Sequence, residues 1–409
     1  KIVGYQWSPK SHEIKDFLSG NLIPFQWLDI LNHDDAAELI KINNIDNKDL
    51  PAVFFEDGSY LLNPNTSEVG SKTGMNVQAR QTVYDVAIIG AGPAGLAAGV
   101  YGGSEGLSTV LIEKRAPGGQ AGTSSRIENY LGFPNGLSGA ELSRRAITQA
   151  TRFGIEFLSP QEVKSIDIKD QYKLLQLSDG STINARSVIL TCGVDYQKHP
   201  AKGIDKFTGA GIYYGAATTE AYACKDQDVF IIGGGNSAGQ AAMYLSKFAG
   251  TVNIVVRKPD LSSSMSQYLI DQIGHTQNIN VMGCMEIEEV KGNERLEEIT
   301  LKNNQTGEIL NRSAAALFIF IGARPMTDWI NINVIKDEKG FIETGTSLLK
   351  YDGYKRNWKL KRTPFLLETC VPGVFAAGDV RAGAMNRVAS AVGEGSMAIK
   401  FVHEYLAEN

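Results

Sequence analysis

Two glycine-rich segments are the parts of this chain whose residue types and spacing could do chemistry. Gly90, Gly92 and Gly95 form a G-x-G-x-x-G motif directly after the apolar run DVAII. The first glycine of such a motif permits a tight turn, the second lets the backbone approach a pyrophosphate, and the third allows close packing of helix on strand. The free amides and positive end of the following helix stabilise the phosphates. The pattern predicts a dinucleotide site.

An acidic residue supports this interpretation. Glu113 ends the apolar run STVLIE in the strand that should follow the glycine-opened helix. A carboxylate at that point can accept hydrogen bonds from ribose hydroxyls. Because strand, glycine turn, helix and acid occur in register, an incidental glycine turn is the less favoured interpretation.

The second glycine segment repeats the pattern with Gly233, Gly235 and Ala238 after the run VFII. Its next predicted strand, TVNIVVRK, ends in Arg257 and Lys258 instead of an acid. A basic pair attracts a ribose 2′-phosphate, whereas an acid would repel it. NADPH is therefore favoured over NADH, and the alternative is that the pair is only a solvated strand end.

The four cysteines, Cys192, Cys224, Cys284 and Cys370, lie far apart, and no two have C-x-x-C spacing. Neither a disulfide framework nor a zinc site is indicated, which fits a reducing cytoplasm. The chain is expected to be cytoplasmic.

Length and composition bound the architecture that must position these residues. A chain of 409 residues predicts two to three domains. Hydrophobic residues make up 43%, charged residues 21%, and the net charge is -5, so nothing indicates disorder, nucleic-acid binding or a polybasic membrane surface. The longest apolar run, residues 314–323, is about half of the ~20 residues that span a bilayer, and we expect a buried strand there.

The order of elements predicts an α/β fold. From Tyr84 onward, apolar strands alternate with glycine-opened helices, as in doubly wound parallel sheets. Before that point the pattern predicts strands at 2–7, 24–30 and 50–58, with helices at 12–18 and 34–42, and a linker at 73–82. The amino terminus has neither the apolar stretch nor the cleavage site of a secretory signal. It also lacks an initiator Met, so the expectation is a fragment whose upstream part is missing.

Several short motifs occur in the order typical of one family: GGQ (118–120), ENY (128–130), FIGARP (320–325), AAGDV (376–380) and RVASAVGEG (387–395). From about Tyr84 the chain resembles a low-molecular-weight thioredoxin reductase, a pyridine nucleotide-disulfide oxidoreductase. The resemblance implies two Rossmann-like domains in three layers and a homodimer made through the FAD domains. It places an FAD domain at 83–198 and 318–409, with an NAD(P)H domain inserted at 199–317.

The resemblance also implies cofactor contacts for both nucleotides. For FAD these are Gly90, Gly92, Pro93, Ala94, Gly95, Glu113, Lys114, Gly119, Gln120, Asn129, Val163, Cys192, Gly193, Gly378, Asp379, Arg387, Val388 and Ala389. For NADPH they are Gly233, Gly235, Asn236, Ser237, Ala238, Arg257, Lys258 and Gly322. The helix that begins near Arg387 would direct its positive end at the flavin pyrimidine.

The sequence departs from the family where the family does its thiol chemistry. The family carries a C-x-x-C where this chain has Tyr214 to Thr219, without sulfur. A flavin cannot pass electrons to a disulfide by thiol exchange without a thiolate. Cys224 lies nearby, and a packing role is favoured for it over a redox role. The serine run Ser262 to Ser264 also replaces an arginine that the family often has, which weakens the NADPH preference.

The first 72 residues resemble a glutaredoxin or thioredoxin fold. Ser8-Pro9-Lys10-Ser11 stands where that fold has C-P-x-C, and the Leu50–Pro51 peptide is expected to be cis. A serine can cap the helix but cannot form a disulfide. Chance similarity of so short a motif is the alternative. Some sequences of this overall pattern carry a signalling domain upstream.

Three functions follow from these observations. The first is an NADPH-oxidising flavoenzyme whose electrons leave FAD for a quinone, dioxygen, another small acceptor or an electron carrier. The second is disulfide reduction through Cys224 or a partner's thiols. The third is a regulatory module that reports flavin redox state or nucleotide occupancy to a partner. The sequence favours the first.

Overall fold

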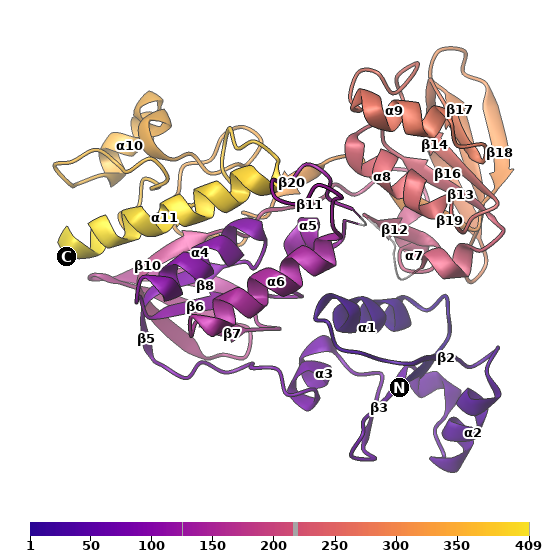
Figure 1. Ribbon diagram of the computed structural model, residues 1–409, viewed down its shortest axis with the longest axis horizontal. Coiled ribbons are helices and arrows are strands. Elements are labelled where there is room, and N and C mark those ends of the chain that lie inside the picture. The colour runs from indigo at the N-terminus through magenta and orange to yellow at the C-terminus, as the bar shows by residue number, and fades with distance from the viewer. Residues whose placement is uncertain (125, 216–219, 409) are drawn as a thin grey trace. The chain divides into compact units, whose positions relative to one another are not determined.

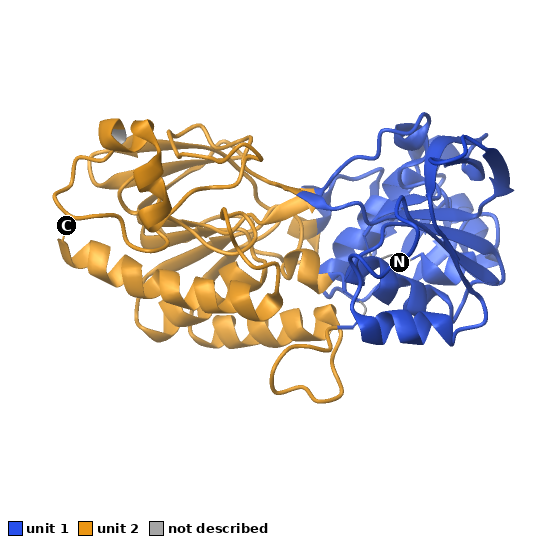
Figure 2. Ribbon diagram, turned by 90° about the horizontal axis from the view of Figure 1, so that it is seen from above, with its two compact units in different colours: residues 1–69, 123–126, 196–323 blue, residues 70–122, 127–195, 324–409 orange. Residues whose placement is uncertain are grey.

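The protein is described from a computed structural model, which covers residues 1–124, 126–215 and 220–408. It divides into two compact units, shown in blue and orange in Figure 2. The blue unit contains an amino-terminal domain, residues 1–69, and an inserted domain, residues 196–323, together with residues 123–126. The orange unit, called the split domain, is made of residues 70–122, 127–195 and 324–409.

The amino-terminal domain is a small four-stranded sheet with helices, in the strand order β2-β1-β3-β4. Strands β1 and β2 are parallel, and the other pairs are antiparallel. Its elements are β1 (Ile2–Gly4), α1 (Pro9–Gly20), β2 (Trp27–Asp29), α2 (Asp34–Ile42), the 3₁₀ helix η1 (Asn47–Asp49), β3 (Ala52–Phe54) and β4 (Tyr60–Leu62). Each predicted strand and helix is present, but the strands are shorter and α1 is longer than predicted, and β4 was not predicted. The Leu50–Pro51 peptide is cis as expected.

Helix α1 begins where the sequence provides a cap and a proline. The Ser8 hydroxyl accepts a hydrogen bond from the Ser11 amide at 3.4 Å, and Pro9 is the first helical residue. Serine is a favoured cap, and proline at this position lacks only an amide that would have no helical partner.

The segment predicted as a linker, residues 73–82, follows α3 (Thr66–Lys72) and has no regular secondary structure. It is anchored on the split domain. The Asn76 amide group donates to the Glu156 carboxylate at 3.2 Å and to the Phe157 carbonyl at 3.0 Å. The Arg80 main-chain amide donates to the same carboxylate at 2.8 Å.

The split domain is built on a seven-stranded sheet in the order β7-β6-β5-β10-β9-β8, with β21 paired to β10. Strands β5, β6, β7, β10 and β21 are parallel. The strands are β5 (Val83–Ile89), β6 (Thr109–Ile112), β7 (Glu156–Leu158), β8 (Val163–Lys169), β9 (Tyr172–Leu177), β10 (Thr182–Leu190) and β21 (Val374–Ala376). The helices are α4 (Pro93–Ser104), α5 (Gly119–Gly122), α6 (Gly139–Arg152), η3 (Gly345–Lys350), α10 (Asp352–Asn357) and α11 (Val388–Glu408).

Both faces of this sheet are covered by apolar side chains. On one face Val86 and Ile88 pack with residues of α4 and α11, and on the other Ala87 and Ile89 pack with Ile342. Strands buried on both faces read as continuous apolar runs, which explains the run DVAII.

The inserted domain contains a five-stranded parallel sheet in the order β12-β19-β13-β14-β15 and a three-stranded antiparallel sheet β16-β17-β18. Its strands are β12 (Ile212–Tyr214), β13 (Asp228–Ile232), β14 (Thr251–Val255), β15 (Ile279–Met282), β16 (Met285–Gly292), β17 (Leu296–Asn303), β18 (Ile309–Ser313) and β19 (Ala316–Ile319). Its helices are α7 (Ile204–Phe207), η2 (Ala221–Cys224), α8 (Asn236–Leu245) and α9 (Gln267–Gly274). Strands β11 (Val194–Tyr196) and β20 (Ala323–Pro325) form a separate pair.

The structure corrects one expected domain boundary. The sequence placed it between residues 317 and 318, but this position falls inside β19, and the inserted domain extends to residue 323. The apolar run 314–323 contains both a buried strand and the turn that follows it, so composition alone did not mark its end. The expected start, residue 199, lies three residues after the observed 196.

Candidate functional site

The first glycine motif forms the turn between β5 and α4. Gly90 has φ +106°, and a Cβ there would lie 2.5 Å from the Thr191 carbonyl oxygen. A Cβ on Gly95 would lie 1.9 Å from the Gly90 carbonyl oxygen. Both positions therefore require glycine, one for its backbone conformation and both for the close approach of neighbouring main chain.

Gly92 is different, because nothing lies within 4 Å of the place where its Cβ would be. It is the residue that precedes α4, so this open space faces the amides at the start of the helix. A pyrophosphate fits such a cradle of main-chain amides, and a side chain would fill it. The residues present fit the diphosphate of a dinucleotide.

Glu113 follows β6 and braces the same turn. Its two carboxylate oxygens accept the amides of Ala91 and Arg115, each at 2.8 Å. Burial raises the pKa of Glu113, against the opposing effect of these two amides. The carboxylate retains further lone pairs, so its expected bond to a ribose remains a prediction.

The distant Gly378-Asp379 pair lies next to this turn. A Cβ on Gly378 would be 2.9 Å from the Ala94 side chain, so the two segments meet at the start of α4. Burial raises the pKa of Asp379, and the nearby Glu394 raises it further. Helix α11 also packs closely here, because a Cβ on Gly395 would be 2.0 Å from the Ala94 carbonyl oxygen.

Glu394 and Arg381 also support the site, although the sequence predicts no role for either residue. Glu394 accepts the Gly378 amide at 2.8 Å and is paired with the Arg381 guanidinium at 2.5 Å. This pair fixes the Gly378-Asp379 turn against α11. Thr191 was also missed: its hydroxyl donates to the Gly90 carbonyl at 2.7 Å.

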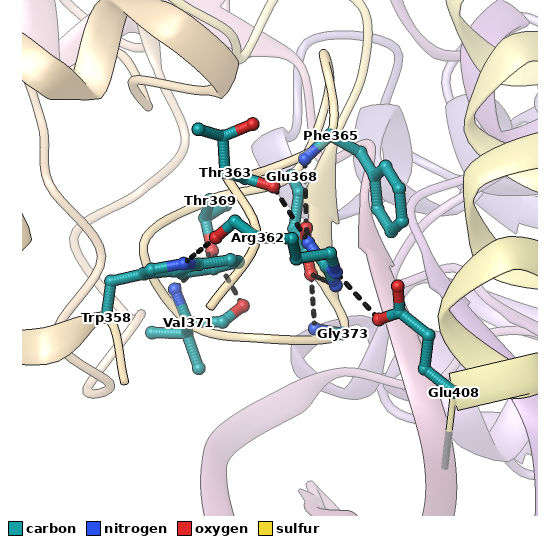
Figure 3. A network of polar contacts seen from close by, with 9 residues as sticks. All are labelled: Trp358, Arg362, Thr363, Phe365, Glu368, Thr369, Val371, Gly373 and Glu408. Atoms are coloured by element: carbon teal, nitrogen blue, oxygen red, sulfur yellow. Dashed lines mark hydrogen bonds and ion pairs between the residues drawn. The ribbon is translucent and has the colours of Figure 1, made fainter. Parts of the chain in front are cut away.

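A buried polar network holds the approach to β21, the strand that leads to Asp379 (Figure 3). The Arg362 guanidinium is paired with the fully buried Glu368 at 2.6 Å and with Glu408 at 2.7 Å. Glu368 also accepts the amides of Phe365 and Gly373, each at 3.0 Å. Both oxygens of this buried carboxylate have hydrogen-bond partners. A buried charge is tolerated in a protein only when it is paired in this way.

The other residues expected at FAD lie in several environments. Gly119 and Gln120 are on α5, and a Cβ on Gly119 would be 3.0 Å from the Gly92 Cα. Val388 and Ala389 begin α11. Lys114, Asn129 and Arg387 are exposed, and Gly193 follows β10 with φ +62°.

Val163 and Cys192 are two further residues expected at FAD. Val163 is 4% exposed within the core of the split domain, so its main chain is the part left for a contact. The Cys192 thiol donates to the Met326 carbonyl at 3.1 Å, and burial raises its pKa to about 12.

The second glycine motif forms the turn between β13 and α8. Gly233 has φ +136°, and a Cβ there would lie 2.3 Å from the Phe320 carbonyl oxygen. Gly235 precedes α8 and has nothing within 4 Å of its Cβ position, as at Gly92. Ala238 is fully buried in the core of the inserted domain, so here the third position has room for a methyl group.

Serines of the segment after β14 hold this second turn. The Ser264 hydroxyl donates to the Gly234 carbonyl at 2.8 Å. Asn236 and Ser266 exchange two hydrogen bonds, at 2.9 and 2.8 Å. In the sequence the serine run indicates only the loss of an arginine, whereas in the structure Ser264 supports the glycine loop. Ser237 is exposed in the first turn of α8.

Arg257 and Lys258 follow β14 and are exposed. His199 was missed: burial lowers its pKa, and the positive charge of Arg257 lowers it further. A neutral imidazole is therefore favoured beside this cation. Gly322 is exposed, with φ +98°.

Cys224 is in η2 and fully buried in the core of the inserted domain. Burial raises its pKa to about 12, and the charge of Glu220 adds to the shift. This environment favours the packing role over the redox role, since a thiol that stays protonated is a poor nucleophile. Of the segment Tyr214 to Thr219, residues 216–219 lie outside the described residues.

Within the described ranges, no group of three or more metal-ligating side chains is arranged to hold a metal ion. In the same ranges, no helix is both long and apolar enough to cross a bilayer. A cavity of about 350 Å³ lies in the inserted domain, but its lining includes Asp228 and Thr251, the first residues of β13 and β14. Phe230, Asn253 and Met282 also line it, so the cavity extends along β13, β14 and β15, and the glycine turn at Gly233 is not part of its lining.

Two glycine cradles, each at the carboxyl end of a parallel strand in a separate sheet, define a protein that binds two dinucleotides. Residues 84–395 match the family model of the pyridine nucleotide-disulphide oxidoreductases, and the chain belongs to this family. The amino-terminal domain lies outside the matched residues.

Curated relatives and solved structures agree with this assignment. The chain is 32% identical over 331 residues to the thioredoxin reductase of Bacillus subtilis (strain 168), which covers 81% of this chain and 97% of that protein. It is 33% identical over 334 residues to that of Peptoclostridium litorale, covering 80% and 98%. The structure resembles the crystal structure of Lactococcus lactis thioredoxin reductase, with a TM-score of 0.70, 28% identity and coverage of 80% and 100%. The T. acidophilum enzyme gives a TM-score of 0.70, 29% identity and coverage of 79% and 99%.

The predicted fold class, two Rossmann-like α/β domains, is confirmed. The chain is a NAD(P)H-dependent flavin oxidoreductase resembling thioredoxin reductase, with FAD and NADPH as its cofactors.

Proposed function

We propose that the chain passes hydride from NADPH to FAD and then electrons to an acceptor other than a dithiol of its own. The observation that carries this proposal is the contrast between two open glycine cradles, at Gly92 and Gly235, and the burial of Cys224. The sequence has no C-x-x-C, and Cys224 has no cysteine near it in sequence. Nucleotide binding is thus supported and thiol exchange is not.

In this proposal the protein supplies binding, orientation and electrostatics. FAD and NADPH provide the redox chemistry when they are bound. The turns at Gly92 and Gly235 hold the two diphosphates, and Glu394 holds the Gly378-Asp379 turn in place. The start of α11 presents main-chain amides and the positive end of a 21-residue helix, which stabilises negative charge in front of it. Orientation of this kind needs no side-chain acid.

Anaerobic stopped-flow mixing of the flavin-loaded protein with NADPH tests the first half of the proposal. We expect the flavin absorbance to bleach, and to return on addition of a quinone, dioxygen or an electron carrier. Steady-state rates of NADPH and NADH oxidation with each of these acceptors test the second half of the proposal, which is the transfer of electrons from FAD to an acceptor. Absence of bleaching without oxygen would overturn the proposal.

Disulfide reduction is the second candidate, because the relatives at 32% and 33% identity are thioredoxin reductases. It would require Cys224 or the thiols of a partner. A thioredoxin-coupled disulfide assay comparing the wild type with Cys224→Ser separates these routes. Full turnover in the variant would exclude the route through Cys224. Absence of turnover in both proteins would exclude disulfide reductase activity.

We also propose that residues 1–72 form a glutaredoxin- or thioredoxin-like domain without redox cysteines. Its support is the parallel β1-α1-β2 unit followed by antiparallel β3 and β4, with Ser8 as the cap of α1. A serine hydroxyl keeps the cap but offers no sulfur for exchange. Restoring cysteines at Ser8 and Ser11 and titrating thiols under mild oxidant tests the assignment, which fails if no disulfide forms.

A further inference from the structure

The beginning of the amino-terminal domain contacts the inserted domain, which belongs to the same compact unit. Trp7 packs against the hydrophobic core of the inserted domain. The guanidinium of Arg295, a residue of the inserted domain, lies 4.8 Å from the centre of the Trp7 ring. The packing of this ring on apolar side chains and its contact with a cation both stabilise the association of the two domains.

A buried carboxylate forms the polar part of this contact. Glu220 of the inserted domain is fully buried, and its carboxylate contacts three side chains of the amino-terminal domain. It is 2.9 Å from the His12 ring nitrogen, 3.1 Å from the Lys15 ammonium and 3.1 Å from the Gln6 amide, which donates to it. His12 and Lys15 are three residues apart on α1 and therefore share a face. Without this domain a buried charge would lose these partners, which is costly.

The backbone approach at the same place is also close. Gly209, which follows α7, has φ +81°, and a Cβ there would lie 2.9 Å from the Pro9 Cα. The His12 ring centre is 4.9 Å from that of Tyr213, on β12. Strand β12 is an edge strand of the five-stranded sheet, so α1 contacts a side chain of the outermost strand.

We propose that Gly209, Tyr213, Glu220 and Arg295 form a dedicated docking site on the inserted domain for α1 of its own amino-terminal domain. The amino-terminal domain is bound there as an internal ligand, and the two domains move as one body. Figure 1 shows α1 in the neighbourhood of α7 and β12, in agreement with the contacts above.

His12 and Glu220 each stabilise the charged form of the other. Burial alone would lower the pKa of His12, but the hydrogen bond to Glu220 and the charge of Asp16 outweigh it and raise that pKa. Burial alone would raise the pKa of Glu220, but the bond from His12 and the charges of Lys15 and His12 outweigh it and lower that pKa. Tyr213 and Cys224 also face the cluster. Burial raises the pKa of Tyr213 well above the usual value and that of Cys224 to about 12, and the charge of Glu220 adds to both shifts.

Nicking the 409-residue chain tests whether the site holds the amino-terminal domain without a covalent link. A protease recognition sequence is inserted after the exposed Gly74, and the nicked protein is run on gel filtration. We expect the two wild-type fragments to elute together. Glu220→Gln and Gly209→Ala should weaken the association on the order of a hundredfold, because each disrupts one buried part of the contact.

Two matched controls separate docking from general damage. Gly307→Ala tests backbone strain alone, since Gly307 has φ +76° with nothing within 4 Å of its Cβ position. Glu288→Gln removes an exposed ion pair with Lys302. Both control proteins should keep their fragments together. If Glu220→Gln fails to fold, Trp7→Ala tests the contact with the sequence of the inserted domain unchanged. Separation of the wild-type fragments, or equal behaviour of Gly209→Ala and Gly307→Ala, would overturn the proposal.

Discussion

Arg381 and Glu394 form a two-point ion pair, with the guanidinium 2.5 and 3.1 Å from the two carboxylate oxygens. The oxygen at 3.1 Å also accepts the Gly378 amide. One carboxylate on α11 thus holds both the arginine that follows Asp379 and the turn that contains it. Side-chain exposures of 20% and 12% place the pair mostly out of water, where such contacts count for more.

Glu394→Gln should weaken flavin retention about ten- to a hundredfold, since one partner of a partly buried charged hydrogen bond is removed at about 1–3 kcal/mol. The flavin-to-protein absorbance ratio after dialysis measures the loss. The control is Asp328→Asn, because the Arg324–Asp328 pair is exposed at 64% and 83%. That variant should retain flavin like the wild type, and equal loss in both would contradict the prediction.

Gly92→Ala and Gly235→Ala should each impair the binding of a different nucleotide. Both glycines have negative φ, precede a helix and have free space at the Cβ position, so alanine should lower stability by no more than about 1 kcal/mol. The new methyl group would occupy the space of a diphosphate. We expect Gly92→Ala to lose FAD affinity about tenfold or more, and Gly235→Ala to raise KM for NADPH with FAD retained. Loss of FAD from both variants would show that the assignment is incorrect.

Arg257→Ala and Lys258→Ala should each raise KM for NADPH, together by about tenfold or more, and leave KM for NADH unchanged. A guanidinium or ammonium stabilises a 2′-phosphate and has no comparable partner on a free ribose. Arg312→Ala, at an exposed site on β18 of the same domain, is the control. A parallel rise in KM for both nucleotides would refute a role in selecting the phosphate.

Lys173 should make the free energy of unfolding increase as the pH rises above about 8. It is 2% exposed and donates to the Arg186 carbonyl and the Tyr405 hydroxyl, each at 2.8 Å. Burial lowers its pKa to about 8, below the usual value of about 10.4. Between these values the unfolded chain binds more protons than the folded one, so stability should rise with pH by up to about 1.4 kcal/mol per unit.

Urea unfolding at pH 7.5, 9 and 10 measures this dependence in the wild type and in Lys173→Met. The variant loses the hydrogen bonds of the ammonium group to Gln171, Arg186 and Tyr405, so its absolute stability is not the test. The difference between the two slopes of stability against pH is the test, and identical slopes would refute the assignment.

Periodicity and turn chemistry predicted the elements and both glycine turns, because these depend on residues close in sequence. DVAII became β5, and 34–42 became α2 with the predicted bounds. The supports of the site could not be predicted in the same way. Thr191 lies 101 residues from Gly90, Ser264 lies 30 from Gly234, and Glu220 lies 208 from His12. Such partners leave no local pattern, and only the folded chain brings them together.

The third position of the two glycine turns differs in a way that limits protein engineering. A methyl group has room at Ala238, whereas one at Gly95 would strike the Gly90 carbonyl oxygen. Transplanting the loop of the split domain into the inserted domain should therefore be tolerated at this position, and the reverse exchange should not. Chimeric oxidoreductases built from this scaffold can be recombined in only one direction at this site.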